Sequence, residues 1–289
     1  MTMRLGGPIF SGIHEPEQWV KELKRLGYST AHWPAEAVVP EGVIKDFKKV
    51  VQDADLTIGE VHIFNNTIVP DDKRRKLAIE VAKEKLDLAE QFGANCAVNL
   101  AGSRAKSKVN DHTPGSFDIH PNNLNNETFD LIVDTVKEII DAVKPKRTFY
   151  TLELFPWLLP NSPDSYLRLM KAIERKQFAV HLDLVNIIDS PEKYFKNSLF
   201  IQEVFSKLAP FIKSGHIKDI VLQNKLAVHL DVVQPGFGAL DLKTFLYEYN
   251  KLDKDTPLYI NNFLGEEDDY VREVQHIRNV AQEMNIHIP

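Results

Sequence analysis

Residues 179–184, with the sequence AVHLDL, alternate small or aliphatic side chains with side chains that bind protons or metal ions. Successive side chains of a β-strand point to opposite faces. The aliphatic residues of this segment would therefore share one face, and His181 and Asp183 would share the other. One apolar face and one face that carries His and Asp are typical of a barrel strand that is covered by helices and ends at a polar site.

The same alternation, applied to the other apolar segments, predicts a set of polar residues that point into a barrel. This inward set comprises Glu60, His62, Asn99, Glu153, His181, Asp183, His216, Lys218 and Asn261. A purely structural barrel is filled by bulky branched side chains, and buried charges without partners are costly. So many ionisable groups require partners, and a metal ion would satisfy several of them at once.

Glu153, Asp183 and His216 are the strongest candidates for metal ligands. They end three successive predicted strands and are 30 and 33 residues apart, about one strand–helix–strand repeat. Their side chains should therefore lie next to one another at one end of the barrel. Carboxylate and imidazole ligands together suit Mn²⁺, Zn²⁺, Co²⁺ or Fe²⁺, and a site with mostly oxygen ligands also suits Mg²⁺. We expect a divalent metal, with Mn²⁺ as the first choice.

The elements that would position these residues alternate along the whole chain. Strands are expected at residues 5–10, 29–33, 57–64, 95–101, 149–155, 178–184, 213–220 and 258–262. Helices are expected at residues 15–26, 43–53, 71–92, 127–143, 163–174, 200–208, 242–252 and 267–284. Eight such units predict parallel strands with right-handed crossovers, and most simply a single-domain (β/α)8 TIM barrel over residues 1–289. The long connections 102–126 and 222–240 are expected to cover the mouth of this barrel as lids.

Composition favours a cytoplasmic protein. The chain has 289 residues, a single cysteine (Cys96) and a net charge of −6. One cysteine cannot form an internal disulfide, which fits a reducing compartment. No apolar stretch is long enough for a membrane span, and the acidic charge gives no reason to expect nucleic-acid binding. Association with further copies of the same chain stays open.

Several motifs together resemble one known family. They are residues 98–103 (VNLAGS), 151–153 (TLE), 181–186 (HLDLVN), 215–219 (GHIKD) and 235–241 (PGFGALD). In this order and spacing they resemble the xylose isomerase-like TIM-barrel family, which includes sugar phosphate isomerases and epimerases, inosose dehydratases and ketose 3-epimerases. The resemblance covers nearly the whole chain and implies a small-molecule sugar or sugar derivative as the partner.

The resemblance also implies a metal site made of Glu, Asp, His and Glu from the last four strands. The first three ligands carry over to Glu153, Asp183 and His216. At the fourth position the chain has Asn261 and Asn262. Strand alternation selects Asn261, whereas counting back from the acidic start of the last helix selects Asn262. An amide oxygen can bind a metal but cannot accept a proton near neutral pH.

For an enzyme of this kind, the metal would make a proton next to a sugar carbonyl more acidic and stabilise an enediolate. Glu153 is the first candidate for the base, and Glu60 and His62 are the next. Further residues are candidates for contacts with the substrate. They are His181, Lys218, Asn99, Asn186 and the two aromatic residues Trp33 and Trp157.

Each of these residues also has a purely structural interpretation. His181 could be a core histidine, Glu60 and Lys218 could form an internal ion pair, and the tryptophans could pack against loops. Three functions therefore stay open: a metal-dependent sugar isomerase or epimerase; a lyase or dehydratase acting on a sugar, inositol or keto-glycoside; and a metal-free or inactive sugar-binding relative. The change from Glu to Asn favours the lyase over an epimerase that needs two bases.

Overall fold

Eight parallel strands form a nearly closed barrel in the computed structural model, which describes residues 3–10, 15–33, 39–106, 115–261 and 265–289. The strand order around the sheet is β1 (Arg4–Gly6), β10 (Pro257–Ile260), β7 (Ile212–Ile217), β6 (Phe178–Asp183), β5 (Phe149–Glu153), β4 (Cys96–Asn99), β3 (Thr57–His62) and β2 (Thr30–His32). Each neighbouring pair in this order is parallel. The two end strands approach each other where the backbone N–H of Ser29 donates to the carbonyl of Leu5 at 2.8 Å. The predicted (β/α)8 architecture is confirmed.

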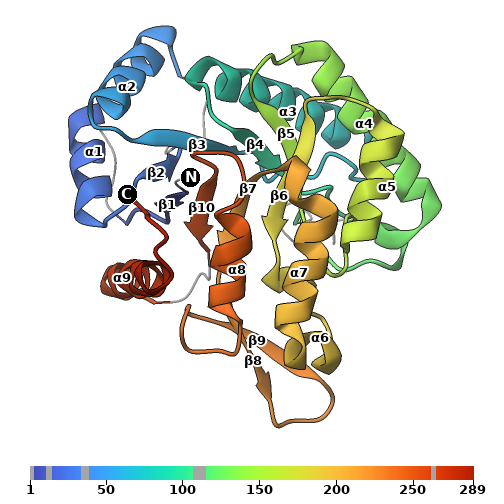
Figure 1. Ribbon diagram of the computed structural model, residues 1–289. Coiled ribbons are helices and arrows are strands. Elements are labelled where there is room, and N and C mark those ends of the chain that lie inside the picture. The colour runs from blue at the N-terminus through green and yellow to red at the C-terminus, as the bar shows by residue number, and fades with distance from the viewer. Residues whose placement is uncertain (1–2, 11–14, 34–38, 107–114, 262–264) are drawn as a thin grey trace.

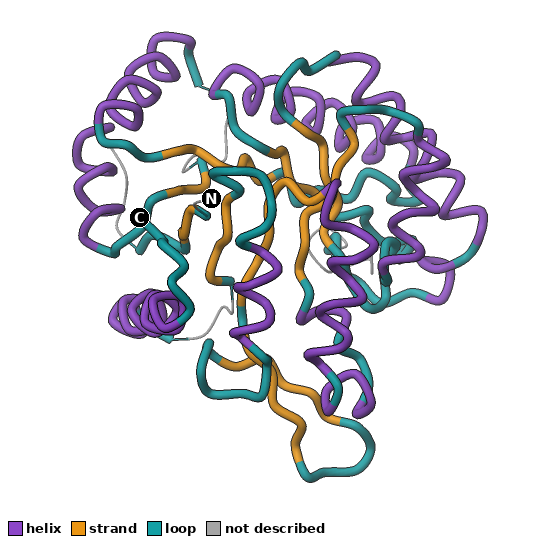
Figure 2. Tube along the Cα trace, in the orientation of Figure 1, coloured by secondary structure: helices purple, strands orange, loops and turns teal. Residues whose placement is uncertain are grey.

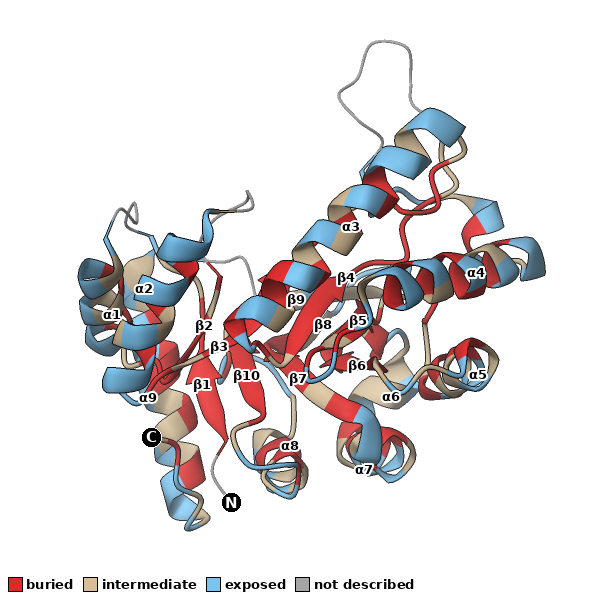
Figure 3. Ribbon diagram, turned by 90° about the horizontal axis from the view of Figure 1, so that it is seen from above, coloured by how far each residue is buried: buried red, intermediate tan, exposed pale blue. Residues whose placement is uncertain are grey.

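Helices surround the barrel on its outer side (Figure 2). They are α1 (Pro16–Arg25), α2 (Glu41–Asp53), α3 (Asp72–Phe92), α4 (Asn126–Val143), α5 (Pro163–Ile173), α6 (Pro191–Phe195), α7 (Asn197–Leu208), α8 (Leu242–Tyr249) and α9 (Glu267–Glu283). Seen from above, the strands and the inner faces of the helices are buried while the outer faces are exposed (Figure 3). The core therefore lies mainly between the strands and the helices, as the apolar outer faces of the strands require.

Local signals in the sequence explain where the longer helices begin and end. The Asp71 side chain accepts a hydrogen bond from the backbone N–H of Arg74 and caps the start of α3. Gly93, with φ 76°, ends that helix in the left-handed conformation that glycine adopts readily. Asn125 caps α4 in the same way as Asp71 caps α3. These caps fix the helix limits and thereby the points at which the chain returns to the barrel.

Strand β6 has the two faces that its sequence predicts. Val180 and Leu182 are buried among the apolar side chains of the core, while His181 and Asp183 are also completely buried. Because the side chains alternate, the two polar residues must lie in the barrel interior. The interior therefore contains buried ionisable groups that need partners.

The prediction for residues 213–240 was wrong in one respect. Strand β7 ends at Ile217, and the chain then forms an antiparallel hairpin of β8 (Asp219–Gln223) and β9 (His229–Val233). The hairpin projects beyond the end of the barrel (Figure 1). Its strands have only five residues each and lie between the barrel strand and the Pro-Gly motif, so the sequence does not set them apart from a loop. The other predicted lid, 102–126, includes a 3₁₀ turn at Pro121–Leu124, and its residues 107–114 lie outside the described part.

Asp219 fastens the loop after this hairpin. One of its carboxylate oxygens accepts hydrogen bonds from the backbone N–H groups of Gly236 and Gly238, each at 3.0 Å, and the other accepts from Leu240 at 2.8 Å. A Cβ atom on Gly238 would lie only 2.3 Å from the carboxylate, so the close approach needs glycine. Asp219 thus holds the loop of residues 236–240 against the end of β7.

We expect Asp219→Ala to lower the free energy of unfolding by about 2 kcal/mol. The substitution removes the carboxylate that accepts hydrogen bonds from the three loop amides, and these amides are partly exposed, so water can replace part of what is lost. Urea denaturation measures the change. Asp231→Ala, at an exposed position on β9, is the matched control and should change stability by less than about 0.5 kcal/mol. Equal stability of the two variants would show that the carboxylate does not hold the loop.

Candidate active site

Four polar side chains meet where the last barrel strands end, and we call Glu153, Asp183, His216 and Asn261 the carboxylate cluster. The pairing of β6 with β7 sets Asp183 directly beside His216. The Nδ1 atom of His216 lies 3.2 Å from Oδ2 of Asp183 and 3.4 Å from Oε1 of Glu153. The amide nitrogen of Asn261 lies 2.9 Å from the same Nδ1. The structure therefore brings the three predicted main metal ligands together, with Asn261 beside them, whereas Asn262 lies outside the described residues.

Two spacings in the carboxylate cluster, from Nδ1 of His216 to each carboxylate, suit the ligands of a divalent cation. Ligand atoms that each lie about 2.1 Å from one ion are about 3.0–3.4 Å apart, close to the spacings between the His216 ring and the two carboxylates. Asn261 could turn its oxygen toward such an ion, since the two ends of an amide have the same shape. Donor atoms of Glu153, His181 and His216 also lie within 4.8 Å of one another. Two carboxylates, one imidazole and an amide suit a metal such as Mn²⁺ or Mg²⁺.

Lys218 and Asn186 complete the surroundings of this cluster. The Nζ atom of Lys218 donates to Oδ2 of Asp183 and to Oδ1 of Asn186, both at 2.7 Å. The Asn186 amide donates in turn to Oε1 of Glu153 at 3.2 Å. Lys218 is thus paired with Asp183, and the alternative of a Glu60–Lys218 ion pair is not what the structure contains. The lysine and the asparagine thus connect the same two carboxylate oxygens that lie near the His216 ring.

The protonation of the cluster follows from its charges. Burial disfavours a charged His216 ring, but the charges of Glu153 and Asp183 and their hydrogen bonds outweigh burial and raise its pKa to about 10. Burial also opposes ionisation of Asp183, whose pKa is nevertheless lowered by Lys218 and His216. Without a metal, the His216 ring is therefore protonated on both nitrogens and positively charged at neutral pH.

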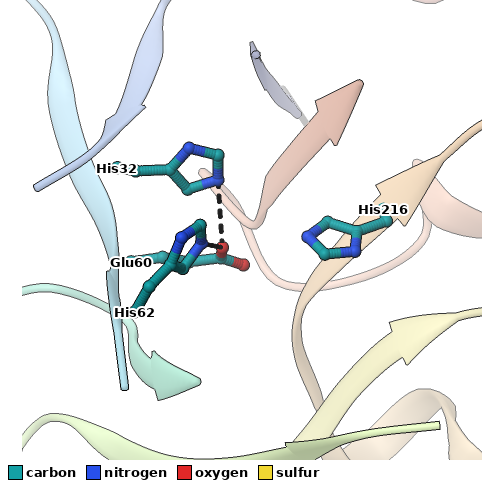
Figure 4. Close-up of side chains that lie close together, drawn as sticks. All are labelled: His32, Glu60, His62 and His216. Carbon is teal, nitrogen blue, oxygen red and sulfur yellow. Dashed lines mark hydrogen bonds and ion pairs between the residues drawn. The ribbon is translucent and has the colours of Figure 1, made fainter. Parts of the chain in front are cut away.

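A second group of donors lies at the ends of β2 and β3, and we call His32, Glu60 and His62 the histidine cluster. Oε2 of Glu60 lies 3.2 Å from Nε2 of His62 and 3.3 Å from Nε2 of His32. His216 faces this cluster from β7 across the barrel (Figure 4). The other carboxylate oxygen of Glu60 lies 3.1 Å from Nδ1 of His181. Both clusters thus belong to one polar interior.

The charge states within the histidine cluster differ from those of the carboxylate cluster. Burial opposes ionisation of Glu60, but His181, His32 and His62 outweigh it and hold its pKa well below the usual range. Burial lowers the pKa of His32 to about 3, with a further contribution from the charge of His62, and burial also lowers the pKa of His62. At neutral pH the cluster therefore consists of one carboxylate and two neutral imidazoles.

His32 is the site residue that the sequence analysis missed. His32 belongs to the expected strand 29–33, and alternation from Ala31 points it inward, but Trp33 is the residue of this strand among the predicted contacts. The ring of Trp33 instead packs against Phe47 and Phe92 of α2 and α3, with ring centres 5.0 and 4.1 Å away. The structure therefore places Trp33 among the helices and brings His32 to the interior.

Two more predicted contacts, His181 and Asn99, lie in the interior, where Nδ1 of His181 and the amide of Asn99 are hydrogen-bonded to other protein groups. Nδ1 of His181 lies 2.7 Å from the Ser214 hydroxyl. The Asn99 amide donates to the Tyr150 hydroxyl at 2.9 Å and accepts from the backbone N–H of Asn65 at 2.8 Å. Asn99 thus joins neighbouring segments of the barrel.

Trp157, by contrast, lines a cavity of about 390 Å³ together with Asn186 and with Leu230 and Val232 of the hairpin. Its indole N–H donates to the carbonyl of Phe117 at 2.7 Å, which fixes the ring. Asn186 contacts both this cavity and the carboxylate cluster. The cavity therefore adjoins the cluster, and the hairpin forms part of its wall.

Comparison with known proteins places the chain in a family. Residues 20–280 match the family model of the xylose isomerase-like TIM barrel, and the chain belongs to this family. No curated protein matches it significantly in sequence. No helix in the described part of the chain is both long enough and apolar enough to cross a membrane.

Solved structures of similar fold include enzymes that act on sugars. D-psicose 3-epimerase from Clostridium cellulolyticum H10, solved with D-tagatose, has a TM-score of 0.69 and 12% identity over 99% of this chain and 100% of its own. A xylose isomerase-like TIM barrel protein from Mycobacterium smegmatis in complex with magnesium has a TM-score of 0.68 and 17% identity over 93% and 90%. The probable 3-DHS dehydratase from Bacillus anthracis has a TM-score of 0.68 and 16% identity over 96% and 99%. At these identities the likeness shows the shared fold.

Proposed function

We propose that this protein is a divalent-metal-dependent sugar isomerase or epimerase that removes a proton next to a carbonyl and proceeds through an enediolate. The observation that carries the proposal is the convergence of Glu153, Asp183 and His216 beside a cavity that Asn186 shares. The epimerase among the structural neighbours and the magnesium complex of another support the reaction class and the metal.

Glu153, Asp183 and His216 would hold the metal, with Asn261 as a fourth ligand. Bound there, a divalent ion would act as a Lewis acid that makes the proton next to a substrate carbonyl more acidic. Glu153 has an oxygen within hydrogen-bond reach of Asn186, which lines the cavity, so it is positioned to take this proton and to return it. Asn186 orients the carboxylate for this transfer.

Lys218 supplies positive charge on the same side of the site. Its ammonium group is held between Asp183 and Asn186 and would donate to a substrate oxygen on which negative charge develops. Trp157 offers an aromatic wall of the cavity against which a sugar ring can lie. Glu60 and His62, predicted as further bases, contact each other. Glu153 would remove the proton, and an epimerisation would also need Glu60 or His62 to deliver a proton to the opposite face.

A lyase or dehydratase is the second candidate, and one observation favours it. Asn261, directly after β10, places its amide beside His216, and an amide cannot accept a proton near neutral pH. Inverting a carbon requires proton transfer on both of its faces, whereas an elimination needs one base and one acid for the leaving group. Glu153 and Lys218 would supply this pair.

Proton exchange with solvent tests the proposal. Protein freed of metal with chelator and then reloaded with Mn²⁺ is incubated in D₂O with ketohexoses, inososes and 3-keto-glucosides, and proton NMR follows the signal next to each carbonyl. We expect at least one substrate to lose this signal with Mn²⁺ and to keep it with excess chelator. A stereoisomer or positional isomer as product supports the isomerase or epimerase, and an unsaturated product supports the lyase.

The same measurement can also contradict the proposed function. Exchange that is equally fast with chelator would exclude the metal dependence. If no compound of the panel exchanges or reacts while a sugar still binds in calorimetry, the protein is a sugar-binding relative instead.

A further inference from the structure

The histidine cluster brings three donor atoms to one place without involving the carboxylates of the carboxylate cluster. We propose that His32, Glu60 and His62 form a second metal site, one that binds a divalent transition metal through two imidazole nitrogens and one carboxylate oxygen. The ligands come from two adjacent strands, β2 and β3, so the barrel itself holds them in place. This inference does not depend on the proposed reaction.

The spacing of the donors matches a coordination shell. Oε2 of Glu60 is 3.2 Å from Nε2 of His62 and 3.3 Å from Nε2 of His32. Four ligands arranged around one ion at about 2.0–2.1 Å lie about 3.4 Å apart. In Figure 4 the rings of His32 and His62 each turn their Nε2 atom toward Oε2 of Glu60, as ligands of one ion would. A nitrogen of His216 lies within 4.8 Å of the other donors, so the second site adjoins the carboxylate cluster.

Hydrogen bonding alone does not satisfy these atoms. Nε2 of His32 is buried and lacks a hydrogen bond of acceptable geometry to any described residue, although the Glu60 carboxylate lies 3.3 Å away. Glu60 is itself fully buried, and its second oxygen faces Nδ1 of His181, 3.1 Å away, which leaves Oε2 for the two rings. Buried polar atoms without partners are rare in proteins. An ion between the imidazoles and the carboxylate would satisfy them.

The donor set indicates the class of metal. Two neutral imidazoles and one carboxylate suit Zn²⁺, Co²⁺ and Fe²⁺, whereas Mg²⁺ prefers an environment of oxygen ligands. The histidine cluster would therefore prefer metals with higher affinity for nitrogen than the carboxylate cluster does. The rings of Tyr259 and Phe64 pack against His32 and His62, with ring centres 3.9 and 4.5 Å away, and would keep the ligands in place.

Cobalt binding tests this inference. The full-length protein is stripped with chelator, loaded with Co²⁺ and dialysed, and elemental analysis gives the ions per chain while the visible absorption reports the coordination. We expect two ions per chain in the wild type, one in His32→Gln and in His62→Gln, and one in Asp183→Asn, which disables the carboxylate cluster alone. His287→Ala, at an exposed position outside both clusters, is the control and should keep two.

The glutamine variants preserve a polar side chain of similar reach, and His32 and His62 are both partly exposed, so folding is expected to survive; circular dichroism verifies it. Should a glutamine variant fail to fold, Asp183→Asn answers the question alone, because any Co²⁺ that it retains must come from outside the carboxylate cluster. One ion in the wild type and none in Asp183→Asn would overturn the second site and leave the proposed function intact. One ion in every protein except His32→Gln and His62→Gln would support the second site and remove the metal from the proposed function.

Discussion

Glu153→Gln is expected to slow solvent exchange of the substrate proton by about 10²–10⁴-fold, because the substitution keeps the size of the side chain and removes the base. The expected loss is large because Glu153 contacts His216 and also the amide of Asn186, a residue that lines the cavity. NMR in D₂O at saturating Mn²⁺ measures the exchange rate. Glu203→Gln, on the exposed side of α7, is the matched control and should exchange at the wild-type rate.

Glu153 is also a predicted metal ligand, and the two roles can be separated. If it acts only as a ligand, raising the Mn²⁺ concentration restores the exchange rate of Glu153→Gln. If it is the base, the variant stays slow even when it is fully loaded with metal. Wild-type exchange rates in the variant at every metal concentration, low as well as high, would remove Glu153 from both roles.

The affinity for Mn²⁺ is expected to rise about tenfold for each unit of pH between pH 6 and 9. Glu153 and Asp183 raise the pKa of His216 to about 10, so at these pH values the ring binds a proton that the metal must displace. Because the pKa of His216 in the folded protein lies above its usual value, the protonated ring prevails between pH 6 and 9. The small deprotonated fraction that can bind the metal grows about tenfold for each unit of pH. Calorimetric titration of the metal-free protein with Mn²⁺ at several pH values measures the slope.

The same proton has a consequence for stability in the absence of metal. A group whose pKa is raised by folding stabilises the folded state fully below its usual pKa, and this contribution is lost as the pH rises toward the raised value. The chelated protein should therefore lose stability between about pH 6.5 and pH 10, and Mn²⁺ should counteract the loss. A metal affinity that does not change with pH would show either that His216 is not protonated in this range or that it is not a metal ligand.

The barrel and most of its inward residues could be predicted from the sequence because both depend on local patterns. In β6 the alternation of Val180 and Leu182 with His181 and Asp183 is visible without knowledge of any other strand. Caps such as Asp71 and Gly93 are equally local. The ends of elements and the faces of strands follow from such signals.

The partners of Glu60 and Lys218 could not be predicted, because they depend on which strands are neighbours in the barrel and on their register. Lys218 meets Asp183 and not Glu60, since β7 lies beside β6 and well away from β3 in the strand order. Glu60 meets His32 because β2 is paired with β3 at these positions. The hairpin of β8 and β9 could not be predicted for another reason. Each of its strands has only five residues, and they lie close to a Pro-Gly motif that is typical of a loop.

Anomalous diffraction from crystals grown with Mn²⁺ tests whether Glu153, Asp183 and His216 hold a metal ion. We expect a manganese peak about 2.0–2.3 Å from carboxylate oxygens of Glu153 and Asp183 and from a ring nitrogen of His216. A structure with Mn²⁺ in the crystal and no peak at these three residues would contradict the metal-dependent function proposed for this barrel.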